Sequence, residues 1–154
     1  MAVNKSSASD DPYDLNRFVV EQNPVYDRVL AELRAGRKRS HWIWYVFPQL
    51  RGLGSSPMAQ RYGISSLAEA RAYLDHDVLG PRLRECAQVV ARSTQASAMD
   101  LFGRPDDLKV RSSMTLFSRA ARDPDLRAVF DAVLAKYYGG EPDPLTLDKL
   151  NAER

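Results

Sequence analysis

The feature that most limits what this chain can fold into is a series of apolar stripes with helical spacing, separated by proline or glycine. Apolar side chains at i, i+3, i+4 and i+7 lie on one face of an α-helix, so each stripe predicts a helix with one side in a core. The clearest stripe runs through 126–137, and others occur in 15–22, 26–33, 67–74, 83–90 and 110–121. The sequence therefore predicts a mainly α fold, a compact bundle of about six or seven helices with at most a short strand or hairpin.

Capping residues indicate where these helices begin and end. Asn23-Pro24 and Asp123-Pro124 each place an N-cap residue before a proline at the first helical position. Gly80-Pro81 predicts a further start, and the four residues from Ser66 to Glu69 have the pattern of a capping box. Gly36 and Gly139-Gly140 are typical of helix C-termini. Single turns are expected at 57–62, 98–102 and 143–154.

One run is ambiguous between helix and strand. Residues 42–47 are aromatic and β-branched without an interruption, and Pro48 ends the run in either case. The sequence leaves both interpretations open.

The chain is expected to form one domain. Its 154 residues suit a single core. Residues 1–11 are polar and without periodicity, which predicts a disordered tail, and 12–150 are expected to form the helical domain. No apolar stretch approaches the roughly 18 residues of a membrane span, and the N-terminus lacks the apolar region of a secretory signal. The single cysteine, Cys86, lies in an apolar stripe, so we expect it to pack rather than react. Together these features predict a cytoplasmic protein.

Charge is distributed unevenly along the chain. The segment from Arg34 to Leu67 contains no Asp or Glu and carries +6, although the whole chain carries only +2. A basic segment in a nearly neutral protein favours an anionic partner. The alternative is that these side chains form a solvated face or pair with acids elsewhere in the fold.

The basic segment also contains an unusual combination of residue types. Arginine and lysine suit a phosphate or carboxylate, aromatic faces can stack on a base, and glycines let backbone N–H groups approach an anion. The alternative is that both tryptophans belong to the core. The candidate ligand-binding residues here are Lys38, Arg39, Ser40, His41, Trp42, Trp44, Gln49 and Arg61.

A second candidate patch lies in 106–115. Small hydroxylated side chains beside cationic ones suit an oxyanion, although Ser and Thr also suit close helix packing. The candidates are Lys109, Arg111, Ser112 and Ser113.

His41 is the first candidate for a catalytic residue if the protein is an enzyme. It stands between Lys38-Arg39 and Trp42, where a polar stretch meets an aromatic one. Neighbouring cations should favour its neutral, proton-accepting form. The structural alternative is an imidazole that bonds a nearby backbone carbonyl.

Cofactor and metal motifs are missing from the sequence. It has no glycine-rich dinucleotide fingerprint, phosphate loop or paired-histidine zinc signature. With two histidines and one cysteine, a histidine-rich or multi-cysteine metal site is excluded. We therefore expect no cofactor and no metal.

Several segments resemble one bacterial family, known as domain of unknown function 1810. They are residues 14–19, 39–49, 61–64 and 109–117, and the His41-Trp42 motif is the most specific part. The resemblance covers about 14–150 and implies a mainly helical fold without an assigned activity. Some members carry the label calpastatin, but such an inhibitor would be long and disordered, whereas this chain has stripes and caps throughout.

Three functions remain open at the level of sequence. The first is the binding of a phosphorylated small molecule or nucleotide through 34–61. The second is a hydrolase of a nucleotide-type N-glycosidic bond, which needs His41, Asp106 or Asp107 beside the anion. The third is a protein-interaction or regulatory domain. Nucleic acid is a weaker expectation as a partner because the total charge is small.

Overall fold

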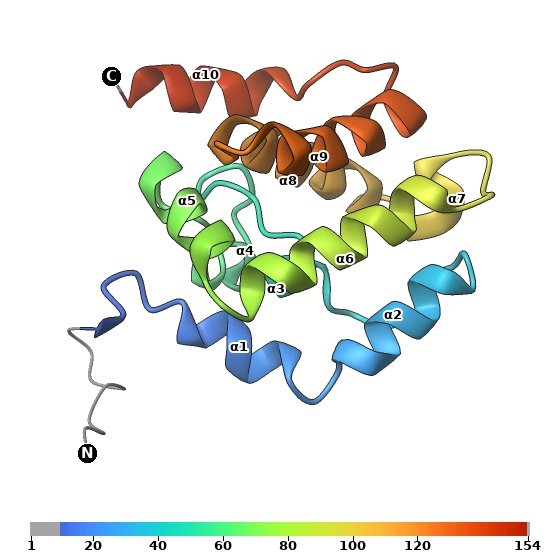
Figure 1. Cartoon of the computed structure of the whole chain (residues 1–154), viewed down its shortest axis with the longest axis horizontal. Coiled ribbons are helices and arrows are strands. Elements are labelled where there is room, and N and C mark those ends of the chain that lie inside the picture. The colour runs from blue at the N-terminus through green and yellow to red at the C-terminus, as the bar shows by residue number, and fades with distance from the viewer. Residues whose placement is uncertain (1–9, 154) are drawn as a thin grey trace.

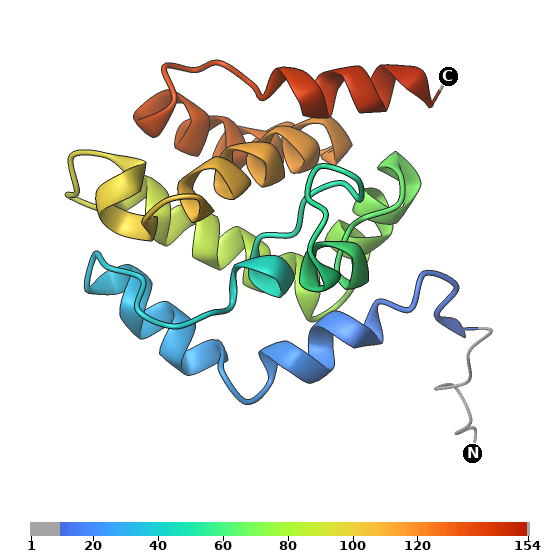
Figure 2. The same cartoon turned by 180° about the vertical axis from the view of Figure 1, so that it is seen from behind.

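The structure, a computed structural model, describes residues 10–153 and is mainly helical, with 64% helix. Within these residues the chain forms ten helices and no sheet (Figures 1 and 2). Their bounds are α1 (Asn16–Gln22), α2 (Tyr26–Arg34), α3 (Ile43–Val46), α4 (Pro57–Arg61), α5 (Leu67–Asp75), α6 (Leu79–Arg92), α7 (Ala98–Phe102), α8 (Asp106–Ala120), α9 (Pro124–Tyr137) and α10 (Pro144–Ala152).

The expectation of six or seven helices was too low. The additional helices are mostly short ones at positions where single turns or an ambiguous run were expected. Side-chain caps explain three of them, because Ser56, Ser97 and Asp143 each accept a hydrogen bond from a backbone N–H in the first turn of α4, α7 and α10. The ambiguous run 42–47 contains α3, a helix of four residues.

In the described part of the chain, strand-like pairing is limited to one parallel bridge between Leu50 and Ile64. The N–H of Ile64 donates to the carbonyl of Gln49 at 2.9 Å, and the N–H of Arg51 donates to the carbonyl of Ile64 at 2.8 Å. This bridge joins the two ends of the glycine-rich loop around α4.

The predicted caps are confirmed in part. Ser66 caps α5 and Asp123 caps α9 through their side chains. The Asn23 prediction was wrong, since Asn23 ends α1 and α2 begins only after Val25.

The start expected at Gly80-Pro81 comes slightly earlier, at Leu79. Nδ1 of His76 accepts from the backbone N–H groups of Val78 and Leu79 there. Close packing explains why position 80 is a glycine, because a Cβ there would lie 2.1 Å from the carbonyl oxygen of Leu74.

Helix α8 is the centre of the fold. It packs against α3, α5, α7, α9 and α10, while α6 contacts α2, α5 and α9. In Figures 1 and 2, α10 lies along one side of the α8–α9 pair, and α1 and α2 form the opposite side of the molecule. Cys86 is fully buried on α6, and burial raises the pKa of its thiol to about 12, as expected for a packing residue.

Most of the tail expected at 1–11 lies outside the described residues. No helix in the range 10–153 has the length and apolar character needed to cross a membrane.

Candidate functional site

A carboxylate from the preceding helix holds the basic segment in place. Oε1 of Glu32, on α2, accepts from the backbone N–H groups of Arg39 and Ser40 at 2.8 and 3.1 Å and from Nε1 of Trp42 at 2.9 Å. Its Oε2 accepts from the Ser40 hydroxyl at 2.6 Å. Burial raises the pKa of this carboxyl, but the hydrogen bonds outweigh burial and lower the pKa to about 2. Glu32 therefore occupies the Ser40 hydroxyl, the Trp42 indole N–H and two backbone N–H groups of the segment, which are not free for an external anion.

A second carboxylate pairs the two candidate lysines. Asp106, at the start of α8, lies 2.6 Å from Nζ of Lys38 and 3.6 Å from Nζ of Lys109. Each ammonium also lies over a tryptophan ring, Lys38 at 5.1 Å from Trp42 and Lys109 at 5.6 Å from Trp44. The side chain of Lys38 is only 6% exposed, so it is an internal ion-pair partner rather than a surface cation.

The tryptophans offer little space to a ligand. Trp42 is 1% exposed and packs on Phe47. The hollow that Trp44 lines with Gln49 and Lys109 has a volume of about 10 Å³, space for about one water molecule. The buried Nε1 of Trp44 has no hydrogen-bond partner among the described residues. Trp42 is therefore closed to a stacking base, and the partly buried Trp44 ring is already covered in part by the Lys109 ammonium.

The exposed members of the segment lie in different places. Arg37, Arg39 and His41 are exposed at the end that follows α2, and the carbonyl of His41 accepts from the Tyr45 hydroxyl at 3.4 Å. Arg51 donates to the carbonyls of Gln60 and Gly63 beside α4. Arg61 lies over the Tyr62 ring. In both ribbon views, α4 lies well apart from the C-terminal end of α2.

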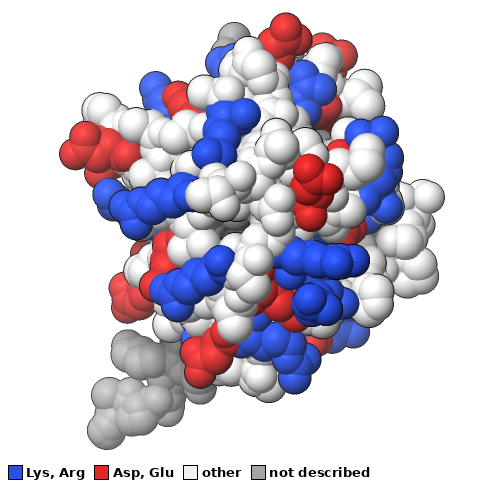
Figure 3. All heavy atoms as spheres, turned by 90° about the vertical axis from the view of Figure 1, so that its right-hand side faces the viewer, with Lys and Arg blue, Asp and Glu red and all other residues white. Residues whose placement is uncertain are grey.

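Acidic residues interrupt the basic surface near the end of α2. Figure 3 views the side of the molecule where α2 and α6 end, and its Lys and Arg side chains alternate with Asp and Glu. Arg34 pairs with Glu85 at 3.8 Å. The hollow between Arg34 and Arg92 lies at two helix C-termini, where the carbonyl ends disfavour an anion.

The second sequence-predicted patch joins α8 to the segment before α10. Arg111 donates to the carbonyls of Glu141 and Pro142, and Ser112 donates to Oδ2 of Asp143 at 3.1 Å. The Ser113 hydroxyl is buried and unpartnered within the described residues. Arg111 and Ser112 are thus used in tertiary packing.

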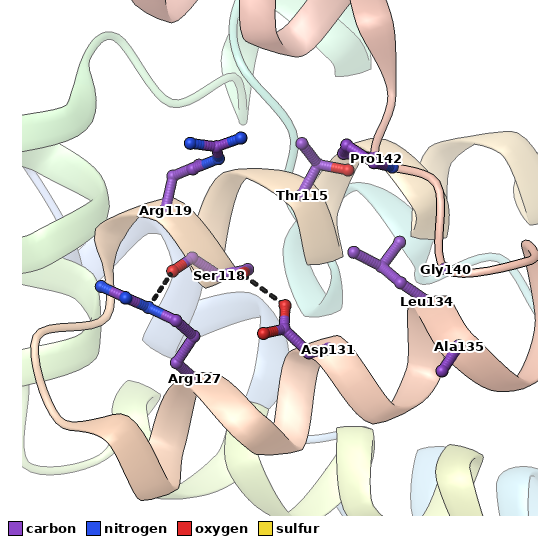
Figure 4. Close-up of a pocket in the computed structure, with 9 residues that line it drawn as sticks. All are labelled: Thr115, Ser118, Arg119, Arg127, Asp131, Leu134, Ala135, Gly140 and Pro142. Atoms are coloured by element: carbon purple, nitrogen blue, oxygen red, sulfur yellow. Dashed lines mark hydrogen bonds between the residues drawn. The ribbon is translucent and has the colours of Figure 1, made fainter.

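A larger hollow lies toward the C-terminal end of α8, and apart from Thr115 its lining residues lie outside the patches expected from the sequence. It has a volume of about 640 Å³ and lies between α8, α9 and the segment before α10. Figure 4 shows Arg119 and Thr115 extending from α8, while Arg127 and Asp131 reach from α9 toward Ser118. We call this the first hollow.

A second hollow, of about 500 Å³, lies between α5, the end of α8 and α10. Arg119 lines it too, together with Arg71 of α5. Because Arg119 belongs to both hollows, we treat them together as the Arg119 groove.

The three arginines of the groove differ in the number of hydrogen bonds that their side chains make to the protein. Arg127 donates from Nε to the carbonyl of Ser118 at 3.1 Å and from Nη2 to the carbonyl of Ala121 at 2.7 Å. Arg71 donates from Nε to the carbonyl of Ala120 at 3.3 Å. These bonds satisfy carbonyls at the C-terminus of α8, which would otherwise repel an anion. The Arg119 side chain is exposed and has neither a hydrogen bond nor an ion pair within 10–153.

The groove has polar groups but no recognisable catalytic set. The Ser118 hydroxyl donates to Oδ1 of Asp131 at 2.5 Å. An ordinary carboxylate is too weak a base to activate a serine hydroxyl, and His41 lines neither hollow. No cluster of three or more metal-ligating side chains occurs among the described residues.

Comparisons with known proteins give a family but no activity. A family model described as a protein of unknown function (DUF1810) matches residues 12–150. A crystal structure of the conserved hypothetical protein Rv1873 from Mycobacterium tuberculosis is similar, with a TM-score of 0.87 and 61% sequence identity over 91% of this chain and 98% of that one. No curated protein matches.

Proposed function

Because the chain belongs to the DUF1810 family of proteins of unknown function, its relatives supply no activity, and we propose from the geometry that it binds a small phosphorylated molecule in the Arg119 groove. The ligand class is the one expected from the basic character of the sequence. The location differs, because Arg37 and Arg39 of the basic segment are also exposed cations without a partner among the described residues but line neither hollow, whereas Arg119 lines both.

The free guanidinium of Arg119 carries this proposal. A guanidinium presents a planar fork of N–H donors that matches two phosphate oxygens. Arg119 lines two hollows of about 640 and 500 Å³, and both volumes lie in the usual range for small-molecule sites. An unpaired arginine in a concave site is a ready partner for an anion.

Neighbouring groups favour a phosphate ester over a bare anion. Arg71 and Arg127 keep N–H groups beyond those bonded to α8. Asp131 keeps Oδ2 available, which suits a ligand hydroxyl as a donor. Three arginines face one aspartate and one glutamate across the two hollows, so the local balance is positive.

Binding fits these residues better than catalysis. The hydrolase alternative needs His41, Asp106 or Asp107 beside the anion. Asp106 is paired with Lys38 and Lys109, and Asp107 is paired with Arg104 at 3.0 Å. No specific observation favours the hydrolase or the interaction domain.

Paired arginine variants test the proposal. Arg119→Ala and Arg39→Ala remove the same charge from two exposed side chains without partners among the described residues, one in the groove and one in the basic segment. Calorimetry with inorganic phosphate, glycerol phosphate and AMP measures affinity. Losing charge-assisted hydrogen bonds should weaken binding roughly 10- to 100-fold in Arg119→Ala, whereas Arg39→Ala should bind as the parent does. Weakening in Arg39→Ala alone would move the site to the basic segment and refute the proposal.

A further inference from the structure

The second hollow has an apolar wall beside its cations. Leu67 at the start of α5 and Leu147 and Leu150 of α10 line it, together with Arg71 and Arg119. Leu147 and Leu150 are three residues apart and therefore share one face of α10. All three leucines are partly exposed. The hollow thus combines apolar side chains with guanidinium groups.

Leu147 has no evident structural task. Leu67 and Leu150 pack against the hydrophobic core, but Leu147 belongs neither to the core nor to the side chains packed on it. A leucine in a concave surface, outside the core, exposes apolar area to water. Covering that area with an apolar group of a ligand favours binding. Because Leu147 lines the same hollow as Arg71 and Arg119, a ligand bound in that hollow would cover it.

The two hollows differ in character on either side of Arg119. Thr115, Ser118 and Asp131 line the first hollow together with Leu134 and Pro142, whereas three leucines line the second together with Arg71, Asn151 and Glu153. The acid of the second hollow, Glu153, accepts from the N–H of Leu67 through both oxygens at 3.2 Å, so its charge lies at the N-terminus of α5. An anion on Arg119 therefore has an apolar surface on one side.

We propose that the ligand is a small amphiphile whose hydrocarbon group covers Leu147 in the second hollow while its phosphate binds Arg119. This inference rests on the proposed function, because Arg119 is the anion site in both. Hydrocarbon next to the anionic group distinguishes this ligand from a nucleotide or a sugar phosphate.

A chain-length series of alkyl phosphates tests the inference on the full chain. Ethyl, butyl, hexyl and octyl phosphate, below micelle-forming concentrations, are titrated by calorimetry beside inorganic phosphate. Each methylene buried should strengthen binding by up to about fourfold. The gain should stop at the length that fills the hollow.

A matched pair of α10 variants provides the control. Leu147→Asn should flatten the series while inorganic phosphate binds as in the parent. Leu145→Asn changes a leucine of the same helix that is 64% exposed and lines neither hollow, so the series should stay steep.

The outcomes separate the two proposals. Phosphate binding that depends on Arg119, with no effect of chain length, overturns the amphiphile and keeps the proposed function. A series that stays steep in Leu147→Asn also overturns the amphiphile. Binding to phosphatidic acid vesicles without binding to monomeric octyl phosphate overturns it in favour of a membrane surface. If no phosphate binds, both proposals fail.

Discussion

Replacing Glu32 with glutamine tests why the loop after α2 is ordered. Glu32→Gln keeps the size of the side chain and removes its charge. The carboxylate accepts four hydrogen bonds, two of them from the backbone N–H groups of Arg39 and Ser40. Glutamine has one acceptor oxygen, and its amide would face the Ser40 hydroxyl, so the charge-assisted part of these bonds is lost.

The magnitude follows from the pKa of the Glu32 carboxyl, which the fold lowers from 4.5 to about 2. That difference corresponds to about 3 kcal/mol of free energy of unfolding. Because the folded pKa is the lower one, this stability is fully present above about pH 4.5 and is lost as the pH falls toward 2. At neutral pH the melting temperature of Glu32→Gln should be about 6–12 °C lower.

Urea unfolding of parent and variant between pH 7 and pH 2 measures this contribution. The difference in free energy of unfolding should be about 3 kcal/mol at pH 7 and should shrink through the window from 4.5 to 2. Glu141→Gln, at an exposed side chain without a partner in the described residues, is the control and should change stability by less than about 0.5 kcal/mol. A difference that is absent at pH 7, or that does not shrink in acid, would refute the reasoning.

Two further predictions concern the aromatic run. Trp42→Phe removes a donor to Glu32 and should destabilise the fold by about 2–3 kcal/mol, whereas Trp44→Phe removes an N–H without a partner and should cost less in the same urea experiment. Equal costs would contradict the assigned bonding. His41→Gln should match the parent in melting temperature and phosphate affinity, since the His41 side chain is exposed and lines neither hollow. A large decrease in either quantity would show that His41 has a structural or functional role.

The helices could be predicted from sequence because each carries its own signals. The stripe at 126–137 and the caps at Ser66 and Asp123 depend on neighbours in the chain, and the structure confirms them. The short helices were harder to predict. A four-residue helix such as α3 is stabilised by burial of Ile43, Tyr45 and Val46 against distant elements, which periodicity does not reveal.

The site was less predictable because it depends on tertiary pairing. The stretch 34–67 contains no acid, yet Glu32, two residues before it, accepts hydrogen bonds from its backbone and polar side chains, and Asp106, far along the chain, pairs with Lys38. Arg119 gave no signal, since an arginine in the last turn of a helix is common for reasons of the helix dipole alone. Only the packing of α5, α9 and α10 around the end of α8 makes it part of a groove.

Amide chemical shifts during a phosphate titration test the account most directly. Uniformly ¹⁵N-labelled protein is titrated with inorganic phosphate and then with octyl phosphate. If Arg119 binds the phosphate and Leu147 the hydrocarbon, the largest shifts occur at 115–121, 67–71 and 127–131, with 147–151 added only for octyl phosphate. Largest shifts at 36–44, around Arg39 and His41, would contradict it.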